Sequence, residues 1–471
     1  MNIQKPPANP LGWTKSFLWL AVAVACFHTA YASLRFPSAG WLIFGYALGL
    51  VQLSDQPTVR RAFYFGLAAG FFCAAPQVFF FWTIFGPAAI LLWLVFAFWI
   101  GLFTALACGC TRRWGKIRAA WLIPFLWTGI EYFRSELYYL KFSWLNIGYA
   151  FPNHFSAPLI KYGMYGVGFF IFAAAALVSC APRLKWRWIG WWLALAVLLA
   201  GLAVILAVVS AVRFERPYSP VSIAGIQLEF PSDKILPRVL NQALAKFPDT
   251  QIFVLSEYTL DGPVPDSLKA WCREHSRFLV VGGRDPVGTN DFYDSAFVVG
   301  TNGDVVFRQA KCVPIQFFDD GLPATGQSLW NSPWGKIGFC ICYDLSYARV
   351  TDRLMQQGAQ LLIVPTMDAE DWGRHEHELH TRVAPVRAAE YGVPIFRLAS
   401  SGISQAVAGY GNVVATAPFP GNVDMLSAKL RLPMGGSLPP DRYVAPLCVG
   451  ITAVVLVALL FLHWRDRHRS G

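Results

Sequence analysis

Three residues of this 471-residue sequence combine the chemistry needed for acyl transfer, and each lies at or near the end of an apolar run. Glu257 comes shortly after the run 252–255, and Cys342 directly follows the run 337–341. Lys311 lies just after a third strand-like run. A thiolate can attack an acyl carbon, a carboxylate can move the proton, and an ammonium can stabilise the developing negative charge. We therefore take Glu257, Lys311 and Cys342 as candidate catalytic residues.

Each of these residues, considered alone, also has an ordinary structural interpretation. A glutamate after a strand is more often a salt-bridge partner at the surface. A buried cysteine usually packs as a small hydrophobe, and a single lysine is usually a solvated charge. The order and setting of the three residues favour a site. Helix N–H groups and a nearby cation would favour the thiolate of Cys342.

The elements that must position these residues alternate between strands and helices from residue 218 to 430. Apolar runs predict strands at 221–228, 251–255, 278–282, 295–299, 336–341, 361–365 and 394–399. Amphipathic stretches predict helices at 265–275, 346–357 and 376–391. This alternation is typical of a layered α/β domain. Side chains at strand ends project from rigid elements, which suits Glu257 and Cys342 for a cleft.

The rest of the chain is too apolar for a soluble protein of this length. Residues are 55% hydrophobic and only 14% charged, against about a quarter charged in ordinary soluble domains. A bilayer core needs about 20 apolar residues per helix. The sequence predicts eight spans, near 14–33, 37–54, 62–82, 86–109, 118–134, 158–180, 186–211 and 444–463. We expect a membrane domain at 1–217, a globular domain at 218–430, and a last span with its tail at 431–471.

Basic residues orient the predicted membrane domain. The net charge is +11, and Lys and Arg cluster in alternate connections between the apolar runs and in the C-terminal tail. Under the positive-inside rule these connections and both termini face the cytoplasm, so the globular domain faces outward. No extended basic stripe with interleaved aromatic residues occurs, which argues against nucleic-acid binding. Glu131 and Arg134 end the fifth span, where ionisable residues are often functional; we favour the alternative that they form an ion pair that positions the following loop.

The cysteines and histidines do not predict a metal centre. The ten cysteines are scattered, with no C-x-x-C framework, and most lie in or beside apolar runs. His375, His377 and His380 are close in sequence, and helical spacing would put the last two on one face. The cluster lacks the supporting partners that metal-bound histidines have. We expect neither a metal nor a cofactor.

Several sequence motifs resemble those of the nitrilase superfamily. They are Leu255-Ser256-Glu257-Tyr258, Gly335-x-x-Gly338-x-x-Ile341-Cys342-Tyr343-Asp344, Arg387-Ala388-Ala389-Glu390-Tyr391-Gly392-Val393-Pro394 and Ser401-Gly402-Ile403-Ser404. A domain with these motifs between seven N-terminal spans and one C-terminal span resembles the apolipoprotein N-acyltransferase family. The motifs Glu131-x-x-Arg134 and Phe142-Ser143-Trp144-Leu145-Asn146-Ile147-Gly148-Tyr149 extend the resemblance into the membrane half.

The lysine segment departs from the family pattern and leaves two alignments. Matching Val313-Pro314 to the family's Val-Pro puts Gln309 at the lysine position. Matching Lys311 instead puts Asp319 where the family has a second essential glutamate. We prefer Lys311 because glutamine cannot supply a cation. On this alignment Asp319 supports the site, together with Tyr343 and Asp344.

The resemblance implies a fold, a reaction and its partners. The expected fold is a polytopic bundle of about eight membrane helices plus an αββα nitrilase-like sandwich. The expected enzyme is an acyltransferase of the bacterial inner membrane with its catalytic domain in the periplasm, acting as a monomer. Cys342 would take an acyl chain from a phospholipid, and the α-amine of an apolipoprotein's N-terminal S-diacylglyceryl-cysteine would then attack the thioester. Glu257 would be the base in both steps, and Lys311 would stabilise the oxyanion.

Two other functions remain open from the sequence. The first is a membrane-anchored amidase that passes its thioester to water. The second is a catalytically inactive relative that binds lipoproteins. The unusual lysine segment supports this alternative, because one of its two alignments has no lysine.

Overall fold

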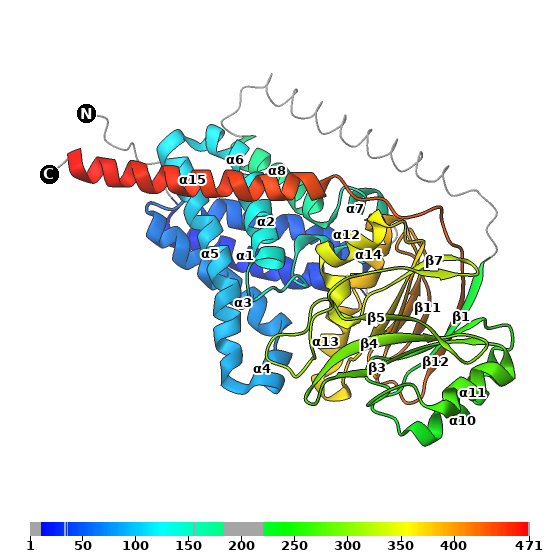
Figure 1. Cartoon of the computed structure of the whole chain (residues 1–471). Helices are drawn as coiled ribbons and strands as arrows, with labels where there is room; N and C mark the ends of the chain where they lie inside the picture. The colour runs from blue at the N-terminus through cyan, green and yellow to red at the C-terminus, as the bar shows by residue number, and fades with distance from the viewer. Residues whose placement is uncertain (1–10, 33, 35, 154–155, 182–219, 470–471) are drawn as a thin grey trace. The chain divides into compact units, whose positions relative to one another are not determined.

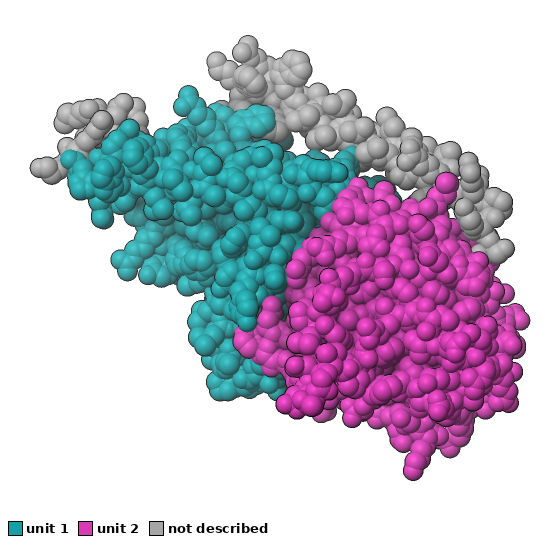
Figure 2. All heavy atoms as spheres, in the orientation of Figure 1, with its two compact units in different colours: residues 1–151, 158–208, 439–471 teal, residues 152–157, 209–438 magenta. Residues whose placement is uncertain are grey.

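The computed structural model describes residues 11–32, 34, 36–153, 156–181 and 220–469. The chain divides into two compact units, which Figure 2 shows in different colours. The first comprises residues 1–151, 158–208 and 439–471, and the second comprises residues 152–157 and 209–438. The C-terminal helix therefore belongs to the unit formed by the N-terminal helices, although more than 200 residues of sequence separate them.

The first unit is built from helices (Figure 1). They are α1 (Trp13–Tyr31), α2 (Ile43–Leu53), α3 (Val59–Gln77), α4 (Phe80–Phe85), α5 (Ala89–Trp114), α6 (Lys116–Tyr132), α8 (Met164–Cys180) and α15 (Asp441–Arg469), with the short α7 (Ala157–Ile160) between α6 and α8. Small residues let neighbouring helices approach closely. A side chain at Gly66 of α3 would clash with Thr104 of α5, and one at Gly129 of α6 would clash with Cys448 of α15. Such contacts are typical of helices that pack within a membrane.

Two helical stretches of the described chain, Phe80–Trp114 and Asp441–His468, are long and apolar enough to cross a membrane. Helices occupy five further segments in which we predicted spans, but they do not meet both criteria, and Ser38–Leu53 and Met164–Cys180 are apolar but shorter. The span predicted at 186–211 lies outside the described residues. The structure therefore does not confirm eight spans.

The end of α6 holds the loop that follows it, as the sequence predicted. Glu131 Oε1 accepts a hydrogen bond from the Ile147 N–H at 2.9 Å. The Arg134 guanidinium donates to the Phe142 carbonyl at 2.9 Å and to Asn146 Oδ1 at 2.6 Å. Glu131, Arg134, Asn146 and Ile147 are buried, so these contacts fix the loop rather than an exposed surface.

The second unit contains two six-stranded sheets with the orders β12-β1-β2-β3-β4-β5 and β11-β10-β9-β8-β7-β6. The strands are β1 (Val221–Ile226), β2 (Ile252–Leu255), β3 (Phe278–Val287), β4 (Asp291–Val299), β5 (Val305–Ala310), β6 (Trp330–Ser332), β7 (Gly335–Phe339), β8 (Leu361–Thr366), β9 (Ile395–Ala399), β10 (Ser404–Val407), β11 (Val413–Ala417) and β12 (Met425–Leu430). Each sheet has three adjacent parallel strands, β1-β2-β3 and β7-β8-β9, flanked by antiparallel ones.

Apolar side chains join the sheets to each other and to the helices outside them. The Phe307 ring of β5 stacks on Phe339 of β7, with ring centroids 5.4 Å apart. The amphipathic helices α10 (Leu236–Lys246) and α11 (Asp266–His275) bury Leu240 and Leu268 in a core with β1, β2 and β3 (Figure 1). The helices α12 (Ala348–Gln356) and α14 (Val383–Tyr391) lie beside the second sheet. The unit therefore has the predicted layers of helix, sheet, sheet and helix.

The single helix predicted at 376–391 is instead two helices, α13 (Arg374–His380) and α14. Pro385 explains the difference. A proline lacks the backbone N–H and its ring clashes with the carbonyl one turn earlier, here that of Thr381, where the helix is interrupted. The break separates the buried His380 from the buried Arg387, and both side chains contact the site described next.

Candidate active site

Glu257 projects from the end of a fully buried parallel strand. Its strand, β2, lies between β1 and β3, and only 2% of Glu257 is exposed. Gly282 of β3 lies against the Glu257 backbone, since a Cβ at position 282 would come within 2.5 Å of the Glu257 Cα atom. The carboxyl ends of parallel strands are where α/β folds place their sites, so the strand-end argument for Glu257 holds in the structure.

Cys342 lies just beyond the end of β7 and begins a 3-10 turn, Cys342–Ser346. Its φ of +49° lies in the left-handed region, which is rare for residues other than glycine and common where backbone strain presents a functional group. Arg387 of α14 holds this turn by donating to the carbonyls of Leu345, at 3.1 Å, and Ser346, at 2.8 Å. An ion pair with Glu390 at 2.6 Å balances the buried guanidinium.

Lys311 is the cation of the site, and it is 1% exposed. Its ammonium lies 2.7 Å from Glu257 Oε1, 2.8 Å from Asp320 Oδ2 and 3.4 Å from Asp294 Oδ2. The alternative residue, Gln309, is bound elsewhere, because its amide donates to the carbonyls of Ala310 and Gly326. The structure therefore brings Lys311, and not Gln309, to Glu257.

The structure places Asp320, and not the predicted Asp319, beside Lys311. Asp319 is exposed, whereas Asp320 is 5% exposed and accepts hydrogen bonds from Lys311, the Tyr258 hydroxyl at 2.8 Å and the Ile315 N–H at 2.6 Å. An ungapped comparison with the family pattern cannot detect a loop that turns one residue later. That difference displaced the prediction by one position.

Asp344 connects the nucleophile turn to the lysine segment. Its carboxylate accepts hydrogen bonds from the N–H groups of Cys312, at 3.0 Å, Val313, at 2.8 Å, and Ile341, at 3.3 Å. Burial raises the pKa of Asp344 to about 6, although these hydrogen bonds and the charge of Lys311 oppose the rise. Tyr343, the other predicted supporting residue, is buried with its ring 5.0 Å from that of Tyr347.

Burial and the Glu257 charge favour the protonated form of the Cys342 thiol. Burial raises the pKa of Cys342 well above its usual range, the Glu257 carboxylate raises it further, and Lys311 only partly opposes them. Lys311 therefore favours the thiolate, as expected of a nearby cation, but burial and Glu257 outweigh its effect on the pKa. The thiol must lose its proton as it reacts, and Glu257 is placed to take it.

Three carboxyl groups surround the single Lys311 ammonium, so their protonation states are linked. Burial by itself lowers the pKa of Lys311, but Glu257, Asp320 and Asp294 together raise it well above its usual range. Burial, followed by the charge of Glu257, raises the pKa of Asp294 well above its usual range. We infer that Asp294 is neutral and that the lysine keeps its charge.

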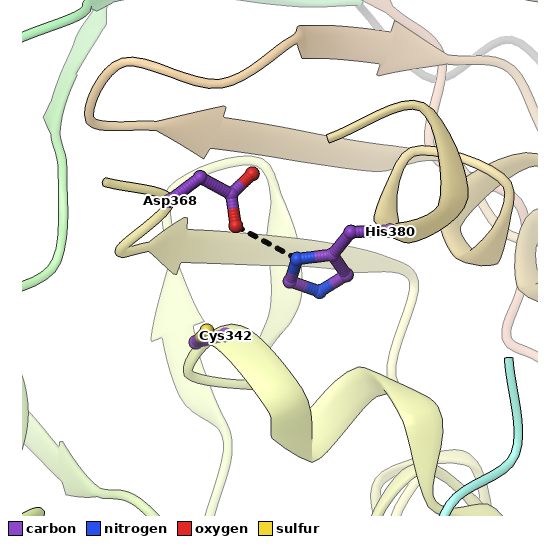
Figure 3. Close-up of side chains that lie close together, drawn as sticks. All are labelled: Cys342, Asp368 and His380. Atoms are coloured by element: carbon purple, nitrogen blue, oxygen red, sulfur yellow. Dashed lines mark hydrogen bonds and ion pairs between the residues drawn. The ribbon is translucent and has the colours of Figure 1, made fainter. Parts of the chain in front are cut away.

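Strand β8 adds residues that the sequence analysis did not identify. The Met367 N–H donates to Glu257 Oε2 at 2.5 Å, and its carbonyl lies 3.6 Å from the Cys342 Sγ atom. Asp368 is fully buried and lies 2.8 Å from Nδ1 of His380, a residue of α13 (Figure 3). Met367 and Asp368 directly follow β8, so the strand-end argument applied to Glu257 and Cys342 would have found them.

The acidic and histidine clusters already have partners for their charges. Glu257, Asp294 and Asp320 come within metal-ligand distance of one another, but the Lys311 ammonium lies among them. Asp368 likewise pairs with Arg397 at 2.6 Å. Both arrangements supply positive charge from the protein itself. His375, the third histidine of the sequence cluster, is exposed. The geometry favours acid–base and nucleophilic chemistry.

Comparison with known proteins gives the same division of the chain. Residues 22–177 match the family model described as "Apolipoprotein N-acyltransferase N-terminal domain", and residues 230–437 match that described as "Carbon-nitrogen hydrolase". The apolipoprotein N-acyltransferase of Geobacter metallireducens is 26% identical, with 93% of this chain and 94% of that protein covered. The one from Shewanella oneidensis is 25% identical, with 94% and 96% covered.

Two solved structures similar to the chain each cover about half of it. A carbon-nitrogen hydrolase from Helicobacter pylori covers 52% of this chain and 95% of its own, with a TM-score of 0.40 and 16% identity. An amidase from a Nesterenkonia species covers 49% of this chain and 96% of its own, with a TM-score of 0.41 and 19% identity.

Two stacked sheets with a cysteine, a glutamate and a lysine at one edge, in a chain that matches the carbon-nitrogen hydrolase model, define an enzyme of the nitrilase superfamily. The N-terminal match and the full-length relatives narrow the class to acyltransferases. The chain belongs to the apolipoprotein N-acyltransferase family.

Proposed function

We propose that the protein transfers a fatty acyl chain from a phospholipid, by way of a thioester on Cys342, to the α-amine of the N-terminal S-diacylglyceryl-cysteine of apolipoproteins. The observation that carries this proposal is the buried contact between Lys311 and Glu257, which the Met367 backbone links to Cys342 of the other sheet, in a chain that matches both family domains. Neither a metal nor a cofactor takes part in the proposed reaction.

In the first half-reaction the Cys342 sulfur attacks the ester carbon of the phospholipid. Glu257 takes the thiol proton as the S–C bond forms, because the resting thiol is protonated. When the ester C–O bond breaks, Glu257 gives that proton to the departing oxygen, and a lysophospholipid leaves. Lys311 stabilises the negative oxygen of the tetrahedral intermediate, a contribution of about 3–4 kcal/mol when one such donor is removed from comparable sites.

In the second half-reaction the lipoprotein amine attacks the thioester. The new C–N bond forms, the C–S bond breaks, and the Cys342 sulfur recovers a proton through Glu257. Met367 supports both steps, since its N–H binds Glu257 while its carbonyl lies beside the Cys342 sulfur. The N-acylated lipoprotein then leaves the resting enzyme.

We also propose that the chain spans the bacterial inner membrane about eight times, with the catalytic domain in the periplasm. The two apolar helical stretches and the alternation of basic connections support this topology. Phe317 and Phe318, which are 67% and 40% exposed, follow Lys311 in the chain and suit contact with an acyl chain. We propose that the enzyme acts as a monomer.

The test of this proposal compares two cysteines that lie two residues apart. Cys342→Ala should abolish both lysophospholipid release and the acyl adduct seen by intact-protein mass spectrometry. Cys340→Ala should leave both largely intact. The Cys340 side chain is fully buried as a small hydrophobe, and the strained backbone that presents a thiol is at Cys342. An adduct that persists in Cys342→Ala would refute the nucleophile.

The same assay separates transfer from hydrolysis. Wild-type adduct should disappear faster when a diacylglyceryl lipopeptide is added, and the lipopeptide should gain the mass of one acyl chain. Adduct loss at the same rate with and without the lipopeptide would indicate a membrane-anchored amidase. A wild type that forms no adduct would instead indicate the inactive lipoprotein-binding relative.

A further inference from the structure

In the second half-reaction the amine nitrogen loses two protons, and the Glu257–Lys311–Cys342 group accepts one of them. An α-amino group at neutral pH is largely an ammonium with three N–H bonds, and the amide product keeps one. The Cys342 sulfur takes back one proton when the C–S bond breaks. The other proton needs an acceptor near the same sulfur.

His380 lies where such an acceptor is needed. The Cys342 Sγ atom, a carboxylate oxygen of Asp368 and a ring nitrogen of His380 all lie within 4.8 Å of one another. Figure 3 shows the imidazole between the Asp368 carboxylate and the turn that begins at Cys342. An attacking amine stands about 3 Å from the acyl carbon bonded to that sulfur. His380 is therefore within hydrogen-bond reach of the incoming nitrogen in a plausible complex.

Asp368 fixes the orientation of His380. Its Oδ1 atom lies 2.8 Å from Nδ1 of His380, while its Oδ2 atom binds Arg397 at 2.6 Å. Ser400 Oγ accepts from the Asp368 N–H at 3.0 Å and donates to its carbonyl at 2.9 Å. Gly402 lies so close that any side chain there would clash with the Asp368 carboxylate. A carboxylate held at both oxygens selects the tautomer with the proton on Nδ1 and the lone pair on Nε2.

The charges around His380 keep its ring neutral. Burial, followed by the positive charge of Arg397, lowers the pKa of His380 to about 4. The Asp368 carboxylate stays ionised, because Arg397 and His380 hold its pKa well below the usual range despite its burial. His377, on the same helix, differs, because Asp368 and Glu376 raise its pKa to about 9 against the effect of burial. At neutral pH His380 is therefore the uncharged imidazole beside Cys342.

We propose that His380 is a catalytic base for the second half-reaction alone, and that Asp368 positions it. His380 takes one proton from the bound ammonium, the freed lone pair of the nitrogen then forms a bond to the thioester carbon, and the C–S bond breaks. The second proton returns to the Cys342 sulfur through Glu257, and His380 then releases its proton to solvent. This inference rests on the proposed transfer of the acyl chain to an amine.

The test measures the two half-reactions separately on the full-length protein in detergent micelles. Acyl-adduct formation is followed with a defined diacyl phospholipid, and transfer is followed by adding a synthetic diacylglyceryl lipopeptide to the preformed adduct. His380→Gln should form the adduct at nearly the wild-type rate. Its transfer to the lipopeptide should be slower by about 10²-fold or more, the usual contribution of a positioned base. His375→Gln, an exposed histidine on the same helix, should match the wild type in both steps.

Imidazole rescue provides a readout that a purely structural role would not change. Added imidazole should restore part of the transfer rate in His380→Ala and leave adduct formation unchanged. Asp368→Asn should slow transfer in the same way as His380→Gln, because asparagine can donate to Nδ1 and select the wrong tautomer.

Three results would overturn the inference. They are normal transfer by His380→Gln, loss of adduct formation together with transfer in every His380 variant, and failure of imidazole to restore any transfer in His380→Ala. A wild type that never acylates the lipopeptide would instead overturn the proposed function, so the two failures are distinguishable.

Discussion

Replacing Asp320 by asparagine should slow acyl-adduct formation by about 10²-fold, whereas Asp319→Asn should leave it nearly unchanged. The Asp320 carboxylate accepts from Lys311 at 2.8 and 3.0 Å, from the Tyr258 hydroxyl at 2.8 Å and from the Ile315 N–H at 2.6 Å. An asparagine keeps one of the two oxygens and places an NH₂ group against a donor. Each hydrogen bond to a charged group contributes about 1.5–3 kcal/mol.

The effect on rate follows from the lysine position. Loss of about 3 kcal/mol of the interactions that hold the Lys311 ammonium corresponds to about 10² in rate if the oxyanion contact is lost. The assay is the rate of adduct formation by intact-protein mass spectrometry at saturating phospholipid, with Asp319→Asn as the matched control. Equal effects of the two substitutions, or an unchanged rate in Asp320→Asn, would show that Asp320 does not position the lysine.

Three further predictions follow from the charges and from the topology. Lys311→Met should lower adduct formation by at least 10²–10³-fold, and Gln309→Met far less; the reverse ranking would mean that the two alternatives for the lysine position are exchanged. Because the folded-state pKa of His380 is lowered from 6.5 to about 4, its contribution to stability is complete above pH 6.5 and is lost as the pH falls toward 4. Thermal unfolding of wild type and His380→Gln should therefore show the wild-type advantage shrinking by about 3 kcal/mol between pH 7 and pH 4, and a constant difference would contradict the neutral ring. Reporter fusions near Gly303 and at Gly471 should report opposite sides of the membrane, and signals from the same side would contradict the proposed orientation.

The sequence predicted the central strands and two of their site residues because buried parallel strands read as continuous apolar runs. The runs before Glu257 and Cys342 are of this kind, and every residue of β2 is buried. The edge strands β11 and β12 were not predicted, because their buried and exposed positions are mixed. Apolar periodicity is weak in such strands.

Other parts of the site depend on contacts that no local pattern encodes. Asp294 lies within β4, and only the packing of β4 against the lysine segment shows that it faces Lys311. The choice between Asp319 and Asp320 depends on one residue of loop geometry. The protonated state of Cys342 depends on the depth of burial and on Glu257, and neither can be derived from a spacing.

The Asp344 carboxylate joins the nucleophile turn to the lysine segment through hydrogen bonds, so the two are expected to move together. Because it binds the N–H groups of Cys312 and Val313 as well as that of Ile341 in its own turn, the lysine segment cannot move away from the nucleophile turn without leaving two donors without an acceptor. Each such donor costs about 1–3 kcal/mol. Space for a long acyl chain must therefore come from elsewhere, and the exposed loop around Phe317 and Phe318 is the part of this segment that can yield. Substrates of different bulk should thus change the conformation of that loop while the reacting groups keep their spacing.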